Sequence, residues 1–219
     1  MHIDGKRILL TGAAGGIGAA SAKELAGAGA LLTLVSRNAQ ALEALLGQLP
    51  GDGHRVLVAD LATSAGRAAV IAAGQDVDGL INNAGVNPFG MFAQQSEAEW
   101  RQALELNLMV PMLLIQGLLA ALQARQGWVV NVGSAFGSIG FPGSAAYSAS
   151  KFGLRGLTEA LRRELAGTGV SLHYLAPRAT ATEINAGPMA AMNTEMGTAV
   201  DQPDRVAREL LALLRSGKG

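Results

Sequence analysis

Hydrophobic residues along the chain gather in short, nearly continuous runs, and longer stretches with helically spaced apolar positions separate these runs. Continuous apolar character over a short run is typical of a strand that is covered on both faces, as in a parallel sheet. The pattern therefore predicts six strands, at Arg7–Gly12, Leu31–Arg37, His54–Asp60, Asp78–Gly85, Gly127–Ser134 and Val170–Pro177.

The intervening stretches predict helices, at Ile17–Ala28, Ala39–Gln48, Ser64–Ala73, Glu97–Ala124, Ala149–Ala166 and Pro203–Leu214. Alternation of strand and helix favours the α/β class, with a doubly wound parallel sheet and helices on both of its faces. No linker or repeat divides the sequence, so we expect residues 1–219 to form a single domain.

The segment Glu183–Gln202 shows no clear period and carries Met189, Met192 and Met196. One interpretation is a surface loop or a set of short helices. Because the segment follows the carboxyl end of a strand, where open α/β sheets bind ligands, we favour a substrate lid at about residues 183–202.

Composition narrows the possible functions. Hydrophobic residues make up 49% of the chain, and the 17 basic residues are balanced by 17 acidic ones. A chain without net positive charge lacks the electrostatic attraction that nucleic-acid binding requires, so nucleic acid is not an expected partner. The absence of cysteine excludes disulfides, thiolate catalysis and Cys-based zinc sites, and His2, His54 and His173 have no spacing typical of a metal site.

The most apolar long segment, Leu104–Leu122, is interrupted by Glu105, Asn107, Pro111 and Gln116. These polar positions favour a buried helix over a membrane span. The N-terminus lacks the long apolar core and the cleavage site of a secretory signal, so we expect a cytoplasmic protein without a membrane partner.

A glycine-rich turn, TGAAGGIG at Thr11–Gly18, connects the first predicted strand to the first helix. Glycines allow a tight turn and a close approach of the backbone to a ligand, and the N–H groups at a helix N-terminus attract phosphate. The turn is not the GxGxxG pattern and could be an ordinary connection, but the strand before it and the helix after it favour a dinucleotide site.

The end of the second strand indicates which dinucleotide binds. A carboxylate about 20 residues after the glycines selects NAD, whereas here Ser36 is followed by Arg37. An Arg side chain would bind a 2′-phosphate, so we expect NADP(H) to be preferred over NAD(H), although a solvated Arg37 is the alternative. Asp60 could accept a hydrogen bond from adenine or could cap the next helix.

Four further motifs follow in order: NNAG at Asn82–Gly85, Asn107 in a helix, Ser134 after the fifth strand, and YSASK at Tyr147–Lys151. Together with the glycine-rich turn, they resemble the short-chain dehydrogenase/reductase family from Lys6 to about Thr182. The resemblance implies a Rossmann-like, dinucleotide-binding oxidoreductase that interconverts a carbonyl compound and a secondary alcohol.

The resemblance also implies roles for individual residues. Tyr147 would be the general acid/base, Lys151 would lower the pKa of Tyr147 and hold the nicotinamide ribose, Ser134 would bind the substrate oxygen, and Asn107 would hold a relay water. The cofactor would contact Gly12, Ala14, Gly15, Gly16, Ile17, Gly18, Ser36, Arg37, Asp60, Leu61, Asn83, Ala84, Gly85, Tyr147, Lys151, Pro177, Thr180 and Thr182. No metal is expected.

Elementary chemistry supports these roles independently. Hydride addition to a ketone creates an alkoxide that needs a proton, and a free phenol with a pKa near 10 regains its charged form poorly at pH 7. Lowering that pKa by about three units requires roughly 4 kcal/mol of preference for the phenolate. A Lys ammonium one helical turn away supplies an interaction of this order in a partly desolvated cleft.

The chain departs from the family pattern at Arg178, where the family has Gly after Pro177. Arg178 could contact an acidic group of the substrate or a phosphate of the cofactor. The sequence also ends without the family's seventh strand, so we expect six strands and a homodimer through Glu97–Ala124 and Ala149–Ala166, a tetramer being the alternative.

Two functions remain open on the sequence alone: an NADP-dependent oxidoreductase, and a protein that binds NADP as a sensor or scaffold without catalysis. The residues expected around a substrate are apolar or aromatic and suggest an apolar or mixed carbonyl compound. They are Val86, Asn87, Phe89, Ala135, Phe136 and Phe141, with the methionines of the lid.

Overall fold

The computed structural model describes residues 2–217 and contains one parallel sheet with the strand order β3-β2-β1-β4-β5-β6. The strands are β1 (Arg7–Thr11), β2 (Leu31–Ser36), β3 (Arg55–Val58), β4 (Gly79–Asn82), β5 (Trp128–Val132) and β6 (Ser171–Leu175). Each lies within the corresponding predicted run, so the six predicted strands and the doubly wound α/β fold are confirmed.

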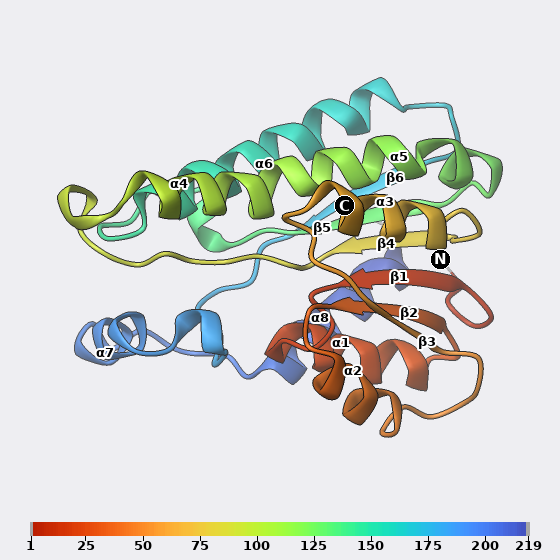
Figure 1. Cartoon of the computed structure of the whole chain (residues 1–219), viewed down its shortest axis with the longest axis horizontal. Coiled ribbons are helices and arrows are strands. Elements are labelled where there is room, and N and C mark those ends of the chain that lie inside the picture. Colours follow the sequence, from red (N-terminus) through yellow and green to blue (C-terminus); the bar gives the residue numbers. More distant parts are fainter. Residues whose placement is uncertain (1, 218–219) are drawn as a thin grey trace.

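Helices cover both faces of the sheet (Figure 1). One face carries α1 (Gly16–Gly27), α2 (Ala39–Leu46) and α8 (Pro203–Ser216), and the other carries α3 (Ser64–Ala73), α4 (Glu97–Leu104), α5 (Val110–Ala124) and α6 (Ala145–Glu164). The remaining helix, α7 (Pro188–Glu195), projects beyond the sheet in Figure 1.

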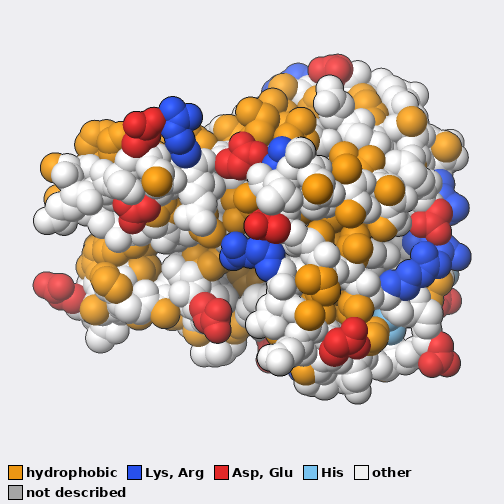
Figure 2. All heavy atoms as spheres, in the orientation of Figure 1, with side chains coloured by type: hydrophobic (Ala, Val, Ile, Leu, Met, Phe, Trp, Pro, Cys, Tyr) orange, Lys and Arg blue, Asp and Glu red, His pale blue; other side chains and the backbone are white. Residues whose placement is uncertain are grey.

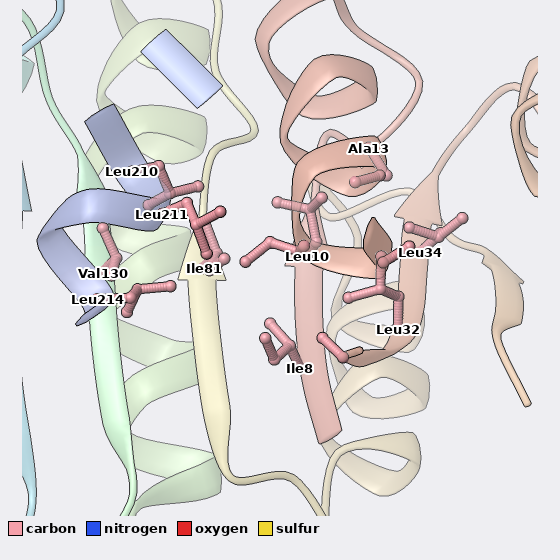
Figure 3. Close-up of a cluster of buried hydrophobic side chains, with 14 of the residues drawn as sticks. Ile8, Leu10, Ala13, Leu32, Leu34, Ile81, Val130, Leu210, Leu211 and Leu214 are labelled. Carbon is pink, nitrogen blue, oxygen red and sulfur yellow. The ribbon is translucent and has the colours of Figure 1, made fainter. Parts of the chain in front are cut away.

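Alternate residues of the strands form two separate cores. Ile8 and Leu10 of β1 pack with α1 and α8 on one face, as Figure 3 shows, whereas Leu9 packs with α5 on the other. All three side chains are fully buried. Because successive side chains of a strand point to opposite faces, a strand with helices on both sides must be apolar throughout, which explains the continuous runs in the sequence.

The predicted long helix Glu97–Ala124 is one continuous rod with an internal irregularity. A π-helical turn, η2 (Glu105–Met109), joins α4 to α5. The rod is long and apolar enough to cross a membrane by length and composition alone. One face of the rod, which includes Leu114 and Leu118, is instead buried against the sheet, as predicted, so it is a core helix.

One helix boundary needs correction. Helix α6 begins at Ala145 rather than at Ala149, so Tyr147 lies within its first turn. Ser144 is the N-cap, and the two alanines that follow it favour helix although they carry no amphipathic signal.

The aperiodic segment 183–202 contains short helices, which was one interpretation of its sequence. They are a 3₁₀ turn, η4 (Glu183–Asn185), and then α7, which starts at Pro188 after Gly187 with a φ of 64°.

Candidate active site

The glycine-rich turn lies where the sheet order reverses, between the carboxyl ends of β1 and β4. Gly12 has a φ of 65°, and a Cβ atom there would lie 2.8 Å from Cα of Ala84, so only glycine fits. Helix α1 follows with Gly15 as its N-cap, without a side-chain cap and without an acidic residue in its first turn. The turn therefore presents backbone N–H groups and the positive end of a helix dipole to an anionic ligand.

Hydrogen bonds fix the two strand ends that meet at this turn. The Thr11 hydroxyl donates to the carbonyl oxygen of Ile81 and accepts from the N–H groups of Asn83 (3.0 Å) and Ala84 (3.1 Å). The Asn83 side chain donates in return to the carbonyl oxygens of Thr11 and Gly12, both at 3.1 Å. These polar contacts hold the ends of β1 and β4 together at the turn.

A cleft of about 400 Å³ extends from the glycine-rich turn to the start of α6. Residues predicted to contact a cofactor form most of its wall: Gly12, Ala14, Gly15, Gly16, Ile17, Gly18, Ser36, Arg37, Asn83, Ala84, Gly85, Tyr147, Lys151, Pro177, Thr180 and Thr182. Asp60 and Leu61 line an adjoining pocket of about 170 Å³, which shares Gly12, Ser36 and Arg37 with the cleft. An elongated cleft with a glycine turn at one end and ionisable groups at the other fits a dinucleotide.

Ser36 and Arg37 lie where the cleft and the adjoining pocket meet. The Ser36 hydroxyl accepts a hydrogen bond from the N–H of Asn38 at 3.3 Å, and the Asn38 side chain caps α2. The Arg37 side chain is exposed and forms no ion pair with any of residues 2–217. Asp60 accepts from the N–H of Ala62, and Thr63, not Asp60, caps α3.

Lys151 and Tyr147 occupy the inner end of the cleft on one face of α6. The Lys151 side chain is 5% exposed, and its Nζ donates a hydrogen bond of 2.8 Å to the carbonyl oxygen of Val132. Nζ also lies 5.7 Å from the centroid of the Tyr147 ring. Burial lowers the pKa of Lys151 to about 8, so the side chain is still charged at pH 7.

Burial also raises the pKa of Tyr147 to about 12, while hydrogen bonding with the Ser134 side chain lowers this pKa. The direction is opposite to the lowered pKa that the sequence led us to expect. Sequence spacing shows that an ammonium is near, but it does not show how deeply the phenol is buried, and desolvation is the larger effect here. Ser134 Oγ also accepts from the N–H of Phe136 at 3.1 Å, which fixes the hydroxyl beside Tyr147.

Asn107 does not line the cleft. Its side chain is fully buried in the π-helical turn, accepts from the N–H of Val86 and donates to the carbonyl oxygen of Val86, both at 2.8 Å. It also donates to the hydroxyl of Ser150 at 3.0 Å. The side chain of Asn107 therefore connects the loop after β4 to α6, and its polar atoms are used by these protein contacts.

Aromatic rings lie beside the tyrosine. Phe136 stacks on Phe141 with centroids 4.8 Å apart and meets the Tyr147 ring edge to face at 6.4 Å. Phe89 lies against Gly143, whose lack of a side chain leaves room for the ring. All three phenylalanines were predicted to surround a substrate. They come from two loops that meet near α6.

Two features of the site were missed in the sequence. Tyr174 of β6 lies behind the tyrosine and lysine: its hydroxyl accepts from the N–H of Ser134 at 3.4 Å and donates to the carbonyl oxygen of Lys151 at 3.3 Å. The cleft wall further includes Asn38, Ala41, Val132, Gly133, Glu183, Ile184 and Asn185. A tyrosine within a strand gives no signal beyond strand formation.

Within residues 2–217, no group of three or more His, Cys, Asp or Glu side chains is arranged to hold a metal ion. The residues present do fit a dinucleotide, since the uncapped helix N-terminus and the side-chain-free turn at Gly12 suit a pyrophosphate.

Comparison with known proteins agrees with this geometry. Residues 6–192 match the family described as short chain dehydrogenase. The chain is 35% identical to nodulation protein G of a Rhizobium species over 94% of the chain and 89% of that protein. It is 34% identical to a 3-oxoacyl-[acyl-carrier-protein] reductase of Vibrio cholerae over 91% of the chain and 82% of that protein.

Solved structures agree as well. A 3-ketoacyl-(acyl-carrier-protein) reductase from Brucella melitensis, complexed with NADH, superposes with a TM-score of 0.88 at 26% identity, over 96% of this chain and 91% of that one. An actinorhodin polyketide ketoreductase with NADPH superposes with a TM-score of 0.87 at 28% identity, over 96% of this chain and 90% of that one. The chain belongs to the short-chain dehydrogenase/reductase family, whose members are NAD(P)-linked oxidoreductases with a Rossmann-like fold.

Proposed function

We propose that the protein is an NADP(H)-preferring oxidoreductase that interconverts an apolar carbonyl compound and the corresponding secondary alcohol. The observation that carries the proposal is the position of Tyr147 and Lys151 in the wall of a cleft that begins at the glycine-rich turn, with the Ser134 side chain hydrogen-bonded to Tyr147. Such a constellation provides a proton donor, a cation and a neutral hydrogen-bond donor beside the place where a nicotinamide would lie.

Tyr147 acts as the general acid in reduction and as the general base in oxidation. The bound nicotinamide supplies or accepts the hydride. As negative charge develops on the substrate oxygen, the Tyr147 hydroxyl transfers its proton to that oxygen, and Ser134 donates a hydrogen bond without changing its charge. The Asn107 side chain, hydrogen-bonded to Val86 and Ser150, keeps the loop after β4 in place beside this site.

Lys151 compensates part of the cost of burying the phenolate. Unit charges about 6 Å apart attract by about 3 kcal/mol at an effective dielectric constant of 20, which equals about two pKa units. This attraction opposes the rise that burial causes in the pKa of Tyr147, and the positive charge of an oxidised nicotinamide would oppose that rise further.

The preference for NADP(H) rests on Ser36 and Arg37 at the junction of the cleft and the adjoining pocket. A carboxylate at Ser36 would repel a 2′-phosphate, whereas Arg37 has its guanidinium free of ion pairs with residues 2–217 and can contact such a group. Asp60 and Leu61 would border the adenine. The glycine-rich turn would hold the pyrophosphate, and Pro177, Thr180 and Thr182 would border the nicotinamide.

The charge around the cleft entrance favours an uncharged substrate. Residues 86–100, 134–147 and 179–200 contain four glutamates and no Lys or Arg. Exposed apolar side chains occur in the same segments, among them Met91, Phe92, Ile139 and Met196. Figure 2 shows hydrophobic side chains on both sides of the hollow between α7 and the start of α4. These segments contain no cation that could bind an anionic group of a substrate, so a neutral apolar carbonyl compound fits them better, with the segment at about 183–202 as its lid.

We further propose a homodimer that forms through the long helices and is located in the cytoplasm. The outward surface of these helices exposes Leu104, Met109, Met112 and Phe152, each between 40% and 45% exposed. Helices α4 and α6 pack against each other, which places these side chains on one surface, and an apolar patch on a helical surface is typical of a subunit interface.

The experiment that tests the proposal is a titration with NADP(H) and NAD(H), followed by assays of NADPH oxidation with neutral ketones and aldehydes. We expect tighter binding of NADP(H) and turnover with an apolar carbonyl compound. Binding of NADP(H) without turnover on a broad set of carbonyl compounds would favour the sensor or scaffold hypothesis. Tighter binding of NAD(H) would refute the role assigned to Arg37.

A further inference from the structure

Arg178, which stands where the family has Gly, lies where the segment 182–200 leaves the sheet and returns to it. The backbone of Asp201, at the returning end, pairs with the leaving end. Its N–H donates to the carbonyl oxygen of Ala179 at 2.8 Å, and its carbonyl oxygen accepts from the N–H of Ala181 at 2.9 Å. Both ends of the segment are therefore held together at its base.

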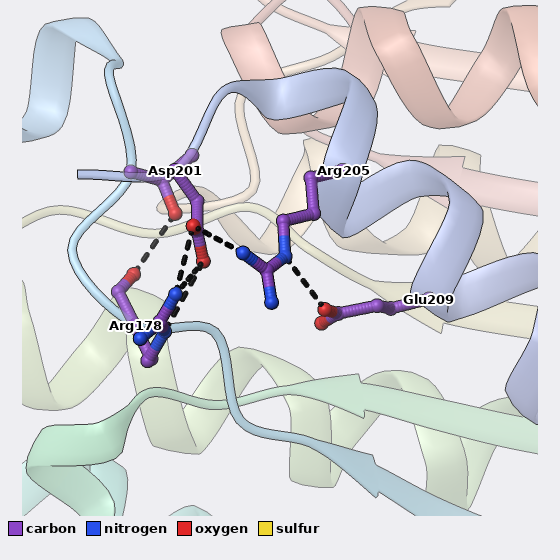
Figure 4. A network of polar contacts seen from close by, with 5 residues as sticks. Arg178, Asp201, Arg205 and Glu209 are labelled. Carbon is purple, nitrogen blue, oxygen red and sulfur yellow. Dashed lines mark hydrogen bonds and ion pairs between the residues drawn. The ribbon is translucent and has the colours of Figure 1, made fainter. Parts of the chain in front are cut away.

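Side chains reinforce this pairing. Arg178 donates to the Asp201 carboxylate through Nη2 (2.9 Å) and Nε (3.3 Å), so two nitrogens of one guanidinium contact the same group. Arg205, in the first turn of α8, donates to the same carboxylate through Nη1 at 3.0 Å and to Glu209 through Nε at 3.2 Å (Figure 4). The side chain of Asp201 is only 9% exposed, which strengthens these charged hydrogen bonds relative to surface pairs.

The base of the segment also contacts the cofactor cleft. Arg178, Thr180 and Thr182 all line the cleft, and a Cβ atom at Gly16 would lie 2.9 Å from Cγ2 of Thr182. Gly16 begins α1, the helix whose N-terminus faces the proposed pyrophosphate site. A movement at the base of the segment would therefore change the shape of the cleft at both the phosphate and the nicotinamide positions.

We propose that Arg178 is a positioning residue that fixes the base of the segment 182–200 through Asp201, and thereby sets how firmly the cleft retains its cofactor. The proposal rests on the proposed function for the identity of that ligand. It replaces the hypothesis, drawn from the sequence, that Arg178 binds an acidic group of the substrate or a cofactor phosphate, because the charge of Arg178 is already paired with a buried carboxylate. Arg178 acts through Asp201 and takes no part in the chemical step.

Limited proteolysis tests the positioning role without any need for turnover. The segment 182–200 contains Glu183 and Glu195 but no Lys or Arg, so a glutamate-specific endoproteinase reports on its opening, and the fragment masses identify the cut. We expect Arg178→Gln to accelerate cleavage at Glu195 by roughly 3- to 10-fold, since a half-exposed charged pair is lost. The cleavage rate of Arg178→Lys should lie between those of the wild type and Arg178→Gln, because Lys keeps the charge but cannot contact the carboxylate through two nitrogens.

Arg7→Gln provides a control, because the Arg7 side chain is also about half exposed and pairs with Asp76 at the amino end of β1, away from the segment. It should leave cleavage of the segment unchanged. In the intact protein, Arg178→Gln should also raise the rate constant for NADPH dissociation and the KM for NADPH by a similar factor, with kcat unchanged. A fall in kcat at constant KM would overturn the assignment.

A double-mutant cycle with Asp201→Asn isolates the pair. If Arg178 acts through Asp201, Arg178→Gln should add no further cleavage in the Asp201→Asn background. The proposal would be overturned if Arg178→Gln accelerated cleavage equally in the wild-type and Asp201→Asn backgrounds, or if Arg178→Gln were cleaved at the wild-type rate. Either result would leave the proposed oxidoreductase function intact. Failure of the wild-type protein to bind NADP(H) would instead refute the proposed function, and the cleavage rates would still decide the role of Arg178.

Discussion

Lys151 and Tyr147 lie one helical turn apart on α6, with Nζ of Lys151 5.7 Å from the centre of the Tyr147 ring. Lys151 is buried and Tyr147 is half-buried, and desolvation shifts their pKa values toward the uncharged forms: the pKa of Tyr147 to about 12 and that of Lys151 to about 8. The pair is therefore ammonium and phenol at pH 7, which is the combination that can donate a proton to an alkoxide.

The buried ammonium should make stability depend on pH. The pKa of Lys151 is about 8 in the folded state and about 10.5 when unfolded, so the unfolded chain binds one more proton between these values. The contribution of Lys151 to the free energy of unfolding should rise with pH from about 8 and be complete above about 10.5, and it is lost as pH falls through 8. Its full size is about 3 kcal/mol.

Chemical denaturation of wild type and Lys151→Met at pH 7.5 and at pH 9.5 measures this contribution. The difference in the free energy of unfolding, wild type minus variant, should increase by about 2 kcal/mol between the two pH values. Groups shared by both proteins cancel in this difference. Parallel stability curves would show that Lys151 is not desolvated as the structure indicates.

Arg37 should determine the choice of cofactor. Loss of its charged contact in Arg37→Ala should weaken NADP(H) binding by roughly 10- to 100-fold and leave NAD(H) within about 3-fold of wild type, because a charge-assisted hydrogen bond is worth about 1.5–3 kcal/mol. Arg55→Ala, on the neighbouring strand β3, is a control for the general loss of positive charge. Isothermal titration with both cofactors measures the effect, and equal weakening of both would contradict the assignment.

The Tyr174 hydroxyl should contribute to the stability of the fold more than to the catalytic rate. Removing its hydroxyl in Tyr174→Phe breaks two long hydrogen bonds, at 3.3 and 3.4 Å, and should lower the free energy of unfolding by about 1 kcal/mol. The catalytic rate should fall less than about 10-fold, because the ring still fills the space beside Gly133 and Gly137. Thermal unfolding and steady-state kinetics check both values; a stability equal to wild type would show that these bonds contribute nothing.

The exposed apolar side chains of the long helices predict that two copies of the chain form a homodimer through this surface. Met112→Glu and Phe152→Glu introduce charge into the proposed interface and should convert a dimer to a monomer of about 22 kDa, the mass of the chain. Met196→Glu changes a more exposed methionine outside that surface and should leave the mass unchanged. Light scattering after size-exclusion chromatography distinguishes these outcomes, and a wild-type monomer would refute the dimer.

Much of the fold follows from the sequence because strand burial and strand period are local properties. Leu9 alternates with Ile8 and Leu10 between two cores, and this arrangement requires the continuous apolar run that marks β1. The glycine turn and the spacing of Tyr147 and Lys151 are equally local. Their positions in the structure therefore agree with the sequence pattern, and the family membership follows from the same motifs.

Other features depend on contacts between distant residues and could not be predicted. Arg178 and Asp201 are 23 residues apart, and only the return of the chain beside β6 makes them partners. The π-helical turn around Asn107 reflects the hydrogen bonds of Asn107 to Val86, 21 residues away. The depth of burial at Tyr147, which decides the direction of its pKa shift, likewise depends on several elements at once.

The role of Tyr147 as the proton donor can be measured most directly by comparing the two tyrosines of the chain in the same assay. Tyr147→Phe and Tyr174→Phe each remove one hydroxyl from a half-buried tyrosine, and NADPH oxidation by a reducible ketone is followed in a single turnover with enzyme in excess. We predict a loss of about 10²- to 10⁴-fold for Tyr147→Phe, with NADPH affinity retained, and less than about 10-fold for Tyr174→Phe. A Tyr147→Phe variant that reduces the ketone at the wild-type rate would contradict the account.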